Sequence, residues 1–250
     1  MKSIISILFL LQAIINTVNL VTAQFPAEPV FRCRDTGNYT TRTDYSRNLK
    51  VALNTVGNMD TYNGGSFNSS IGVNEAAHVM ALCSGISTHW GGNCKDCIHK
   101  LTVQLTIKCL DQKEAVMWGS NCMIHFSDRK ILGSLDDWSR FSLPDKQAGS
   151  LANKPDQFDN LMFFLMHRLK LDASRGTTDK KSEFKVDYEN KPVYGAMQCT
   201  ADLSRDLCDK CLQELIVAHR YCCSGRKAAR IFSPNCFFSY SGQDFSKWKT

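Results

Sequence analysis

A repeating pattern of cysteines constrains this chain more than any other feature of its sequence. Four pairs of cysteines lie 114 residues apart, namely Cys94 and Cys208, Cys97 and Cys211, Cys109 and Cys223, and Cys122 and Cys236. The residues around the last pair also align, since 120–127 match 234–241 in type. A fixed period of this kind predicts two copies of one structural unit.

Length and composition agree with two folded units. The period, taken twice, accounts for nearly all of the 250 residues and leaves a short leader. Hydrophobic residues make up 43% and charged residues 22%, which is typical of globular proteins and excludes a wholly disordered chain. Twelve cysteines are many for this length, but such a chain can also bury a core. We therefore expect disulfides that supplement a hydrophobic core.

The first 23 residues are typical of a secretory signal peptide. Lys2 provides a positive start, residues 4–15 are mostly apolar, and residues 21–23 form a cleavage site before Gln24. Polar residues such as Gln12 interrupt the apolar stretch, so it lacks the uniform length that a membrane span needs. We expect residues 1–23 to be removed and the mature chain to be secreted without a membrane anchor.

Hydrophobic periodicity predicts the same elements in both copies. Apolar residues at helical spacing predict a first helix around 49–56 and its counterpart around 162–169. A second helix is predicted to begin at each Cys-x-x-Cys pair, although residues 101–103 suit a strand equally well. Short apolar runs predict strands at 77–83, 115–119, 122–126, 193–199, 228–233 and 236–240.

These elements predict an α+β fold in two tandem repeats, each an antiparallel sheet with two helices on one face. We place the two domains at 26–130 and 136–245. The joint around 128–143 contains aromatic residues such as Trp138, so we expect the domains to be docked. The segments 63–66 and 175–182 are predicted to be mobile loops.

The cysteines of a secreted chain are expected to form disulfides. An even number in an oxidising compartment predicts a disulfide framework, but sequence alone does not determine the pairing. The two Cys-x-x-Cys pairs also fit a zinc site or a redox centre, because both need two sulfurs close together. Oxidised cysteines do not ligate metal, so we favour structural disulfides and expect no metal and no cofactor. The cysteines concerned are Cys33, Cys83, Cys94, Cys97, Cys109, Cys122, Cys199, Cys208, Cys211, Cys222, Cys223 and Cys236.

The second repeat resembles a domain of a known plant family. Cys199, Cys208 and Cys211 follow the pattern Cys-x8-Cys-x2-Cys, and residues 222–226 and 233–236 continue it. This spacing resembles the ginkbilobin-homologous, or stress-antifungal, domain. A signal peptide and two such domains are similar to the plant cysteine-rich repeat secretory proteins. The family's receptor kinases add a membrane helix and a kinase, which we do not expect in a chain that ends at Thr250.

The resemblance implies a disulfide pairing. The implied pairs are Cys33 with Cys109, Cys83 with Cys94, Cys97 with Cys122, Cys199 with Cys208, and Cys211 with Cys236. The first repeat departs from the family spacing, because ten residues separate Cys83 and Cys94. No cysteine at the start of the second repeat matches Cys33, and Cys222 is an additional cysteine beside Cys223. These two bond either to each other or to a partner, and the sequence leaves both possibilities open.

The resemblance also implies where a sugar site would lie. The single-domain antifungal member binds mannose through an Asn after the first cysteine, an Arg on the strand after the fifth and a Glu after the last. This chain has Arg34, Val116 and Ser127 at these positions of the first repeat, and in the second repeat Arg230 matches but Ser241 replaces the Glu. A sugar site needs several converging polar groups. Arg230 is therefore a possible ligand contact, but we expect no mannose binding through this triad.

The remaining patterns indicate neither an enzyme nor a nucleic-acid-binding protein. The six histidines lie at no recognisable catalytic spacing from a carboxylate or a serine, so we expect no enzyme. The formal net charge is +6, and the densest basic run comprises Arg220, Arg226, Lys227 and Arg230. Four charges attract phosphate too weakly to indicate nucleic-acid binding. We expect this run to form a solvated loop and strand face, with a carbohydrate or protein contact as the alternative.

Two sequons predict glycans on the first repeat. Asn38 and Asn68 each begin an Asn-x-Ser/Thr sequence, and a glycosylated face is not expected to be a large protein interface. The whole pattern predicts a secreted, non-enzymatic binding module of the plant apoplast. Its expected partner is an extracellular protein, such as a receptor ectodomain, or a cell-wall glycan. The alternative is a lectin-like antifungal defence protein. The sequence determines neither the ligand nor the oligomeric state.

Overall fold

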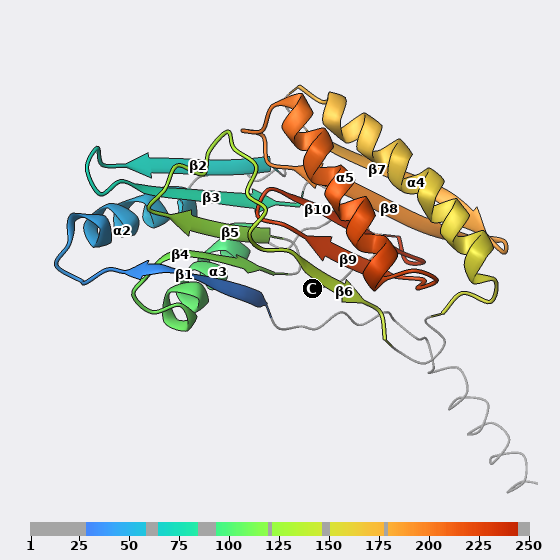
Figure 1. Cartoon of the computed structure of the whole chain (residues 1–250), viewed down its shortest axis with the longest axis horizontal. Helices are drawn as coiled ribbons and strands as arrows, with labels where there is room; N and C mark the ends of the chain where they lie inside the picture. The colour runs from blue at the N-terminus through green and yellow to red at the C-terminus, as the bar shows by residue number, and fades with distance from the viewer. Residues whose placement is uncertain are drawn as a thin grey trace, which may run out of the picture.

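The computed structural model describes residues 29–58, 65–84, 94–119, 122–146, 151–177 and 180–244. The predicted signal peptide lies outside these stretches. Within them the chain forms two five-stranded antiparallel sheets, each covered on one face by two helices (Figure 1). The predicted α+β fold with two tandem repeats is thus confirmed. No helix in the described stretches combines the length and apolar character that crossing a membrane requires.

The first domain contains a sheet with the strand order β1-β4-β5-β3-β2. Its strands are β1 (Val30–Asn38), β2 (Gly65–Ile71), β3 (Ala77–Cys83), β4 (Gln112–Trp118) and β5 (Cys122–Ser127). Its helices are α2 (Asp44–Gly57) and α3 (Cys94–Lys108). Residues 101–103, for which the sequence left helix and strand open, belong to α3.

The second domain repeats this topology with the strand order β6-β9-β10-β8-β7. Its strands are β6 (Phe141–Pro144), β7 (Lys181–Tyr188), β8 (Lys191–Cys199), β9 (Ala229–Phe232) and β10 (Cys236–Ser241). Its helices are α4 (Pro155–Arg175) and α5 (Arg205–Cys222). Each element takes the place of its counterpart in the first domain, so the sequence repeat is also a repeat of the fold.

Capping residues and apolar stripes explain where the helices form. Thr43 and Ser204 precede α2 and α5, and their hydroxyl oxygens accept hydrogen bonds from the backbone N–H groups of Ser46 (3.3 Å) and Leu207 (3.2 Å). Pro155 begins α4, where its missing N–H is not needed. The buried residues of α2 and α4 include the predicted stripes Leu49, Ala52, Leu53 and Val56, and Met162, Leu165, Met166 and Leu169.

Each domain has a core between its helices and one face of its sheet. The largest fully buried side chains of these two cores include Tyr45, Leu101 and Phe126 in the first domain and Phe158, Phe238 and Tyr240 in the second. Burying an apolar side chain of this size stabilises a fold by roughly 1.5–3 kcal/mol relative to leaving it exposed. The disulfides therefore supplement two real cores.

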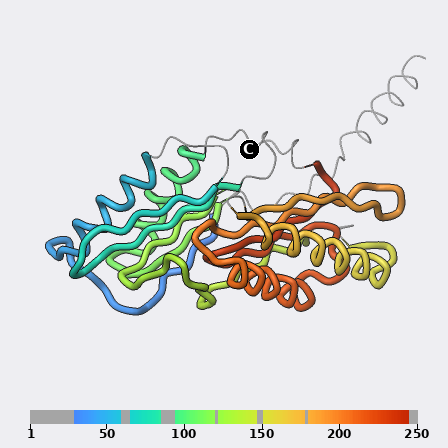
Figure 2. The backbone as a smooth tube through the Cα atoms, turned by 90° about the horizontal axis from the view of Figure 1, so that it is seen from above, coloured from blue at the N-terminus to red at the C-terminus, as the bar shows by residue number. Residues whose placement is uncertain are grey.

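The opposite faces of the two sheets meet in a third apolar cluster, which we call the sheet interface. It is formed by Leu82, Val116, Trp118, Met123, Ala196, Phe232 and Phe237. Trp118 and Phe232 stack across the boundary, 6.3 Å apart between ring centroids, and Trp118 Nε1 donates a hydrogen bond to Ser233 O at 3.0 Å. Figure 2 shows the helix pairs on opposite sides of the molecule, with the sheets between them. The two domains are therefore docked through their sheets.

Two segments expected to be mobile loops contain regular structure instead. Residues 65–66 begin β2, residues 181–182 begin β7 and Arg175 ends α4, whereas 63–64 and 178–179 lie outside the described stretches. Both β2 and β7 are edge strands with one neighbour each. Polar residues are common in edge strands, because one side of the strand faces solvent and lacks a pairing partner. Their hydrophobic signal is correspondingly weak.

All twelve cysteines are in disulfide bonds. Five bridges join the pairs that the resemblance implies, and the sixth joins Cys222 to its neighbour Cys223. Cys94 and Cys97 at the start of α3 are bonded to Cys83 on β3 and Cys122 on β5. The start of α5 is bonded to β8 and β10 in the same way. Each second helix is thus covalently attached to two neighbouring strands of its sheet.

Removing single bridges should affect stability according to the chain loop that each one closes. The Cys33–Cys109 bridge spans 76 residues, whereas Cys222–Cys223 spans one. Loop-closure entropy predicts a loss of about 4 kcal/mol for the double variant Cys33→Ala/Cys109→Ala and less than about 1 kcal/mol for Cys222→Ala/Cys223→Ala. Chemical denaturation followed by circular dichroism measures both values. Equal losses in the two variants would contradict this account.

Candidate functional site

The positions of the family's sugar triad lie on the sheet faces turned away from the helices. In the first domain, Val116 and Ser127 alternate along their strands with residues of the helix-side core and are fully buried. Arg34 lies beside them on β1, which pairs with β4. In the second domain, Ser241 is fully buried and Arg230 is 8% exposed. The fold gathers these positions on one face of each sheet, but it also covers most of them.

A group of ionisable side chains covers this face in the first domain. It consists of Glu114, His125, Arg129 and Asp136, and we call it the charged cluster. Glu114 on β4 and His125 on β5 are fully buried, with 3.3 Å between Oε1 and Nε2. Arg129 donates to both carboxylate oxygens of Glu114, from Nε to Oε2 at 2.9 Å and from Nη2 to Oε1 at 2.7 Å. Its Nη2 also donates to Asp136 from the segment between the domains.

The segment between the domains is held over the charged cluster. Arg34 forms a further ion pair with Glu114 (Nη1 to Oε2, 3.3 Å), and its guanidinium lies 5.4 Å from the ring centroid of Trp138. The backbone N–H of Asp136 donates to Asn235 Oδ1 of the second domain at 2.7 Å. The cluster therefore connects the sheet of the first domain, through this segment, to the second domain.

The charges of the cluster are matched inside the protein. Burial by itself raises the pKa of Glu114, but hydrogen bonding with His125 and Arg129 outweighs burial and lowers this pKa to about 2. The pKa of Arg129 is raised, chiefly by its hydrogen bonds to Glu114. Glu114 is therefore an anion at neutral pH and Arg129 a cation. Removing one partner of such a pair would leave the other buried without compensation.

Three members of the cluster have the chemistry of a cation site. One ligand atom each of Glu114, His125 and Asp136 lies within 4.8 Å of the others, and carboxylates and imidazole ligate divalent metals. The guanidinium of Arg129, however, already binds both carboxylates, and Arg34 supplies a second positive charge beside Glu114. We interpret the cluster as an ion-pair network that positions the segment between the domains.

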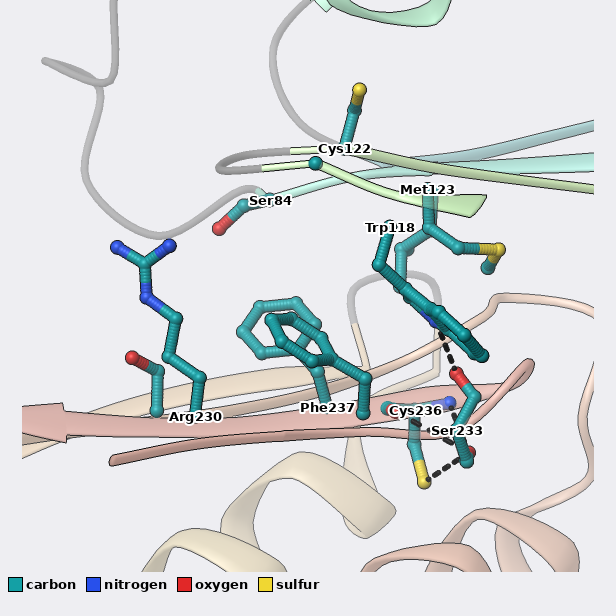
Figure 3. A pocket seen from close by; sticks show the side chains of 12 residues that line it. Ser84, Trp118, Cys122, Met123, Arg230, Ser233, Cys236 and Phe237 are labelled. Atoms are coloured by element: carbon teal, nitrogen blue, oxygen red, sulfur yellow. Dashed lines mark hydrogen bonds between the residues drawn. The ribbon is translucent and has the colours of Figure 1, made fainter. Parts of the chain in front are cut away.

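Arg230 lies at a small cavity in the sheet interface (Figure 3). The cavity measures about 30 Å³ and is lined by residues of both domains, including Trp118, Met123 and Phe237. Burial lowers the pKa of Arg230 to about 10, so the side chain stays charged at neutral pH. A cavity of this size holds a water molecule or two but no sugar ring. The expectation of a solvated face was wrong for Arg230, because the docked sheets bury β9.

The other predicted site residues lie apart from this face or at its edge. Asn38 at the end of β1 and Asn68 on the edge strand β2 are both exposed, and Asn38 Oδ1 accepts a hydrogen bond from Gln112 Nε2 at 2.7 Å. Glycosylation of these two residues remains a prediction. Arg220, at the other end of the basic run from Arg230, is exposed near the end of α5.

Sequence reasoning did not identify the charged cluster. No motif unites Glu114, His125 and Asp136, and only the pairing of β4 with β5 and the course of the following segment bring them together. One signal was available in the sequence. Glu114, Val116 and Trp118 alternate along the chain, so in a strand their side chains point to the same face of the sheet. A charge on the buried phase of a strand indicates a buried partner.

Two docked α+β domains with six disulfides define a tandem disulfide-bonded module. Comparison with known families identifies both halves. The family model described as salt stress response/antifungal matches residues 32–129 and 145–243, which together exceed half of the chain. The chain belongs to this family.

Several curated plant proteins are similar to this chain over most of its length. Cysteine-rich repeat secretory protein 1 of Arabidopsis thaliana is 29% identical over 83% of this chain and 61% of its own length. An antimicrobial ginkbilobin-2-like protein of Castanea crenata is 28% identical over 94% of each chain. Cysteine-rich receptor-like protein kinase 29 of Arabidopsis thaliana is 30% identical over 85% of this chain. This chain spans only 32% of that kinase.

Two solved structures share the tandem fold. The tandem DUF26 ectodomain of the Arabidopsis thaliana cysteine-rich receptor-like protein PDLP8 has a TM-score of 0.66 at 20% identity, covering 86% of this chain and 96% of its own. The corresponding ectodomain of PDLP5 has a TM-score of 0.62 at 19% identity, covering 85% and 97%.

Replacing Glu114 with Gln should destabilise the protein in a pH-dependent way. The pKa of Glu114 is about 2 in the folded chain against an ordinary 4.5, so its charge stabilises the fold above pH 4.5 and this contribution is lost as the pH falls toward 2. We expect Glu114→Gln to lower the free energy of unfolding by about 3 kcal/mol at pH 6, and the difference to vanish near pH 2. Denaturant unfolding across this pH range measures the difference.

An exposed ion pair provides the matched control for this measurement. Arg168 and Asp172 pair on the surface of α4 at 2.8 Å. Asp172→Asn should change the free energy of unfolding by less than about 0.5 kcal/mol at either pH. A deficit of Glu114→Gln that stays constant between pH 6 and pH 2 would argue against a role for the charge of Glu114.

Arg230 should not serve as a mannose contact. Calorimetry with millimolar mannose is expected to detect no binding, because the cavity beside Arg230 is too small for a sugar ring and most of the triad positions are buried. Lys227→Ala, in the same basic run, is a suitable control for Arg230→Ala. Mannose binding that Arg230→Ala abolishes in a folded protein, while Lys227→Ala retains it, would overturn this expectation.

Proposed function

We propose that the protein is a secreted, non-enzymatic binding module of the plant extracellular space that engages a receptor ectodomain or a cell-wall component. The observation that carries the proposal is that all twelve cysteines of this family member are joined in disulfides. Disulfides persist in oxidising compartments and are rare in the cytosol. Relatives named as secretory proteins and as receptor-like kinases support the same location.

The state of the titratable groups supports binding rather than catalysis. Catalytic groups need both a shifted pKa and access to substrate. Among the described residues, the pKa values of Glu114, His219 and Arg230 are lowered furthest, and all three are buried; burial also lowers the pKa values of the partly exposed His78 and His167. Burial lowers the pKa of His219 to about 4, and its Nε2 lies 3.1 Å from the hydroxyl of Tyr240. The three buried groups serve packing and pairing inside the domains.

Because the sheet faces are covered, we expect a partner to contact the outer surface of the molecule. The sugar-triad positions Val116, Ser127 and Ser241 are fully buried, which weighs against a lectin of the family's mannose-binding type. The antimicrobial relative keeps the antifungal alternative open as a second function. We favour a partner that contacts exposed side chains on the helices.

Expression of the whole chain in plant cells tests the proposal. We expect the secreted protein to begin at Gln24, because residues 21–23 form the cleavage site, and mass spectrometry of the extracellular fluid determines this terminus. We also expect the purified protein to bind at least one member of a panel of purified receptor ectodomains or extracted wall fractions.

Reduced and alkylated protein is the control for non-specific binding in this panel. Protein that retains Met1 or stays in membranes after carbonate washing would contradict secretion. Selective binding to fungal mannan, with no binding to ectodomains or wall fractions, would replace the proposal by the antifungal lectin alternative.

A further inference from the structure

A groove between α4 and α5 lies on the outer surface of the second domain. We call it the α4–α5 groove. Its cavity measures about 220 Å³ and is lined by Asp159, Asn160 and Phe163 of α4, His219 and Arg220 of α5, and Ser224 of the turn that follows. In Figure 1 the two helices run side by side over the sheet. The groove is thus far larger than the cavity beside Arg230 and opens away from the sheet interface.

A large apolar side chain is exposed in the groove. Phe163 lines the groove and is 47% exposed. Large apolar side chains that gather on a surface mark interaction sites. Aromatic residues and arginine also dominate the energetic centres of protein interfaces. The groove presents this combination in Phe163 and Arg220.

The first domain shows that the fold does not need these residues. In the internal alignment Lys50 of α2 takes the place of Phe163, and Thr106 of α3 takes the place of Arg220. The equivalent helices form there with their own buried stripes. An exposed Phe163 is therefore not a requirement of packing in this architecture.

The groove offers a positive charge beside an aromatic ring. The guanidinium of Arg220 lies 6.0 Å from the ring centroid of Phe163, and within the described residues no ion pair joins Arg220 to a carboxylate. The nearby acid is already engaged, since Asp159 Oδ1 accepts from the backbone N–H of Gly225 at 2.7 Å and Oδ2 accepts from Ser224. A bound carboxylate would satisfy Arg220 through charge-assisted hydrogen bonds.

We infer that the α4–α5 groove binds a segment of an extracellular protein that inserts one apolar side chain beside Phe163 and places a carboxylate on Arg220. The volume is below the roughly 300–1,000 Å³ of small-molecule pockets and suits a single side chain. A sugar would need acceptors that converge on its hydroxyls, and the carboxylate of Asp159 is bound to the following turn. This inference rests on the proposed function, because it names the surface by which the module engages a protein.

Selection of a random displayed peptide library against the whole folded chain tests the inference. We expect enriched peptides to contain Leu, Ile or Phe with Asp or Glu a few positions away. A synthetic peptide of this consensus should lose about tenfold in affinity for Phe163→Ala and for Arg220→Ala, as expected for interface hot spots. Exchanging the acidic residue of the peptide for Lys should restore binding to Arg220→Glu.

A neighbouring phenylalanine provides the matched control. Phe164 is 56% exposed on the same helix, but its ring faces Phe184 of β7 at 6.4 Å between centroids and does not line the groove. Phe164→Ala should leave peptide affinity unchanged. Circular dichroism verifies that all variants are folded.

Several results would overturn the inference. These are a selection that enriches no peptide, consensus peptides without an acidic residue, and affinities that Phe163→Ala and Arg220→Ala leave unchanged. Binding on a glycan array that Phe163→Ala abolishes would assign the groove to a saccharide instead.

The same variants separate this inference from the proposed function. Ectodomain or wall binding that persists in Phe163→Ala and Arg220→Ala would leave the proposed function standing and refute the groove. If the wild-type chain binds no ectodomain and no wall fraction, the proposed function fails, whatever the peptide affinities show.

Discussion

The packing of one sheet against the other determines which surfaces of this protein can meet a partner. Each sheet uses one face for its helices and the other for the neighbouring domain, where Trp118 and Phe232 stack and Trp118 donates to Ser233 O. Because both faces of each sheet are in use, most positions of the family's sugar triad become interior positions. The helices are left as the broad outer surface. The location of the α4–α5 groove follows from this arrangement.

Charge and covalent bonds secure the same arrangement in different ways. Apolar packing at the sheet interface has no preferred direction. The charged cluster is directional, because the planar guanidinium of Arg129 donates hydrogen bonds to Glu114 and Asp136 only when their carboxylates are suitably placed. The disulfides act within the domains and attach α3 and α5 to their sheets. No disulfide joins one domain to the other. Docking therefore depends on packing and on the segment that the charged cluster holds.

The two repeats share a fold but have diverged where the fold permits it. The first domain closes its long loop with Cys33–Cys109, whereas in the second domain the counterpart of Cys109 is bonded to its own neighbour, Cys222. The helix surfaces differ as well, with Lys50 in one domain where the other has Phe163. Buried positions are constrained by the shared core and exposed positions are not. Differences on the helix surfaces therefore point to function more directly than differences in the core do.

The sequence by itself determined the repeat, the fold class, the helices and the inner strands, because periodicity and cysteine spacing are local patterns. It did not reveal the four edge strands β1, β2, β6 and β7, whose apolar signal is weak. Only the tertiary structure decided that Arg230 is buried and that Glu114, His125 and Asp136 meet, because these outcomes depend on which strands pair and which sheet faces dock. The α4–α5 groove likewise combines residues from two helices that lie about 60 positions apart in the sequence. A local sequence pattern does not show that such distant residues meet.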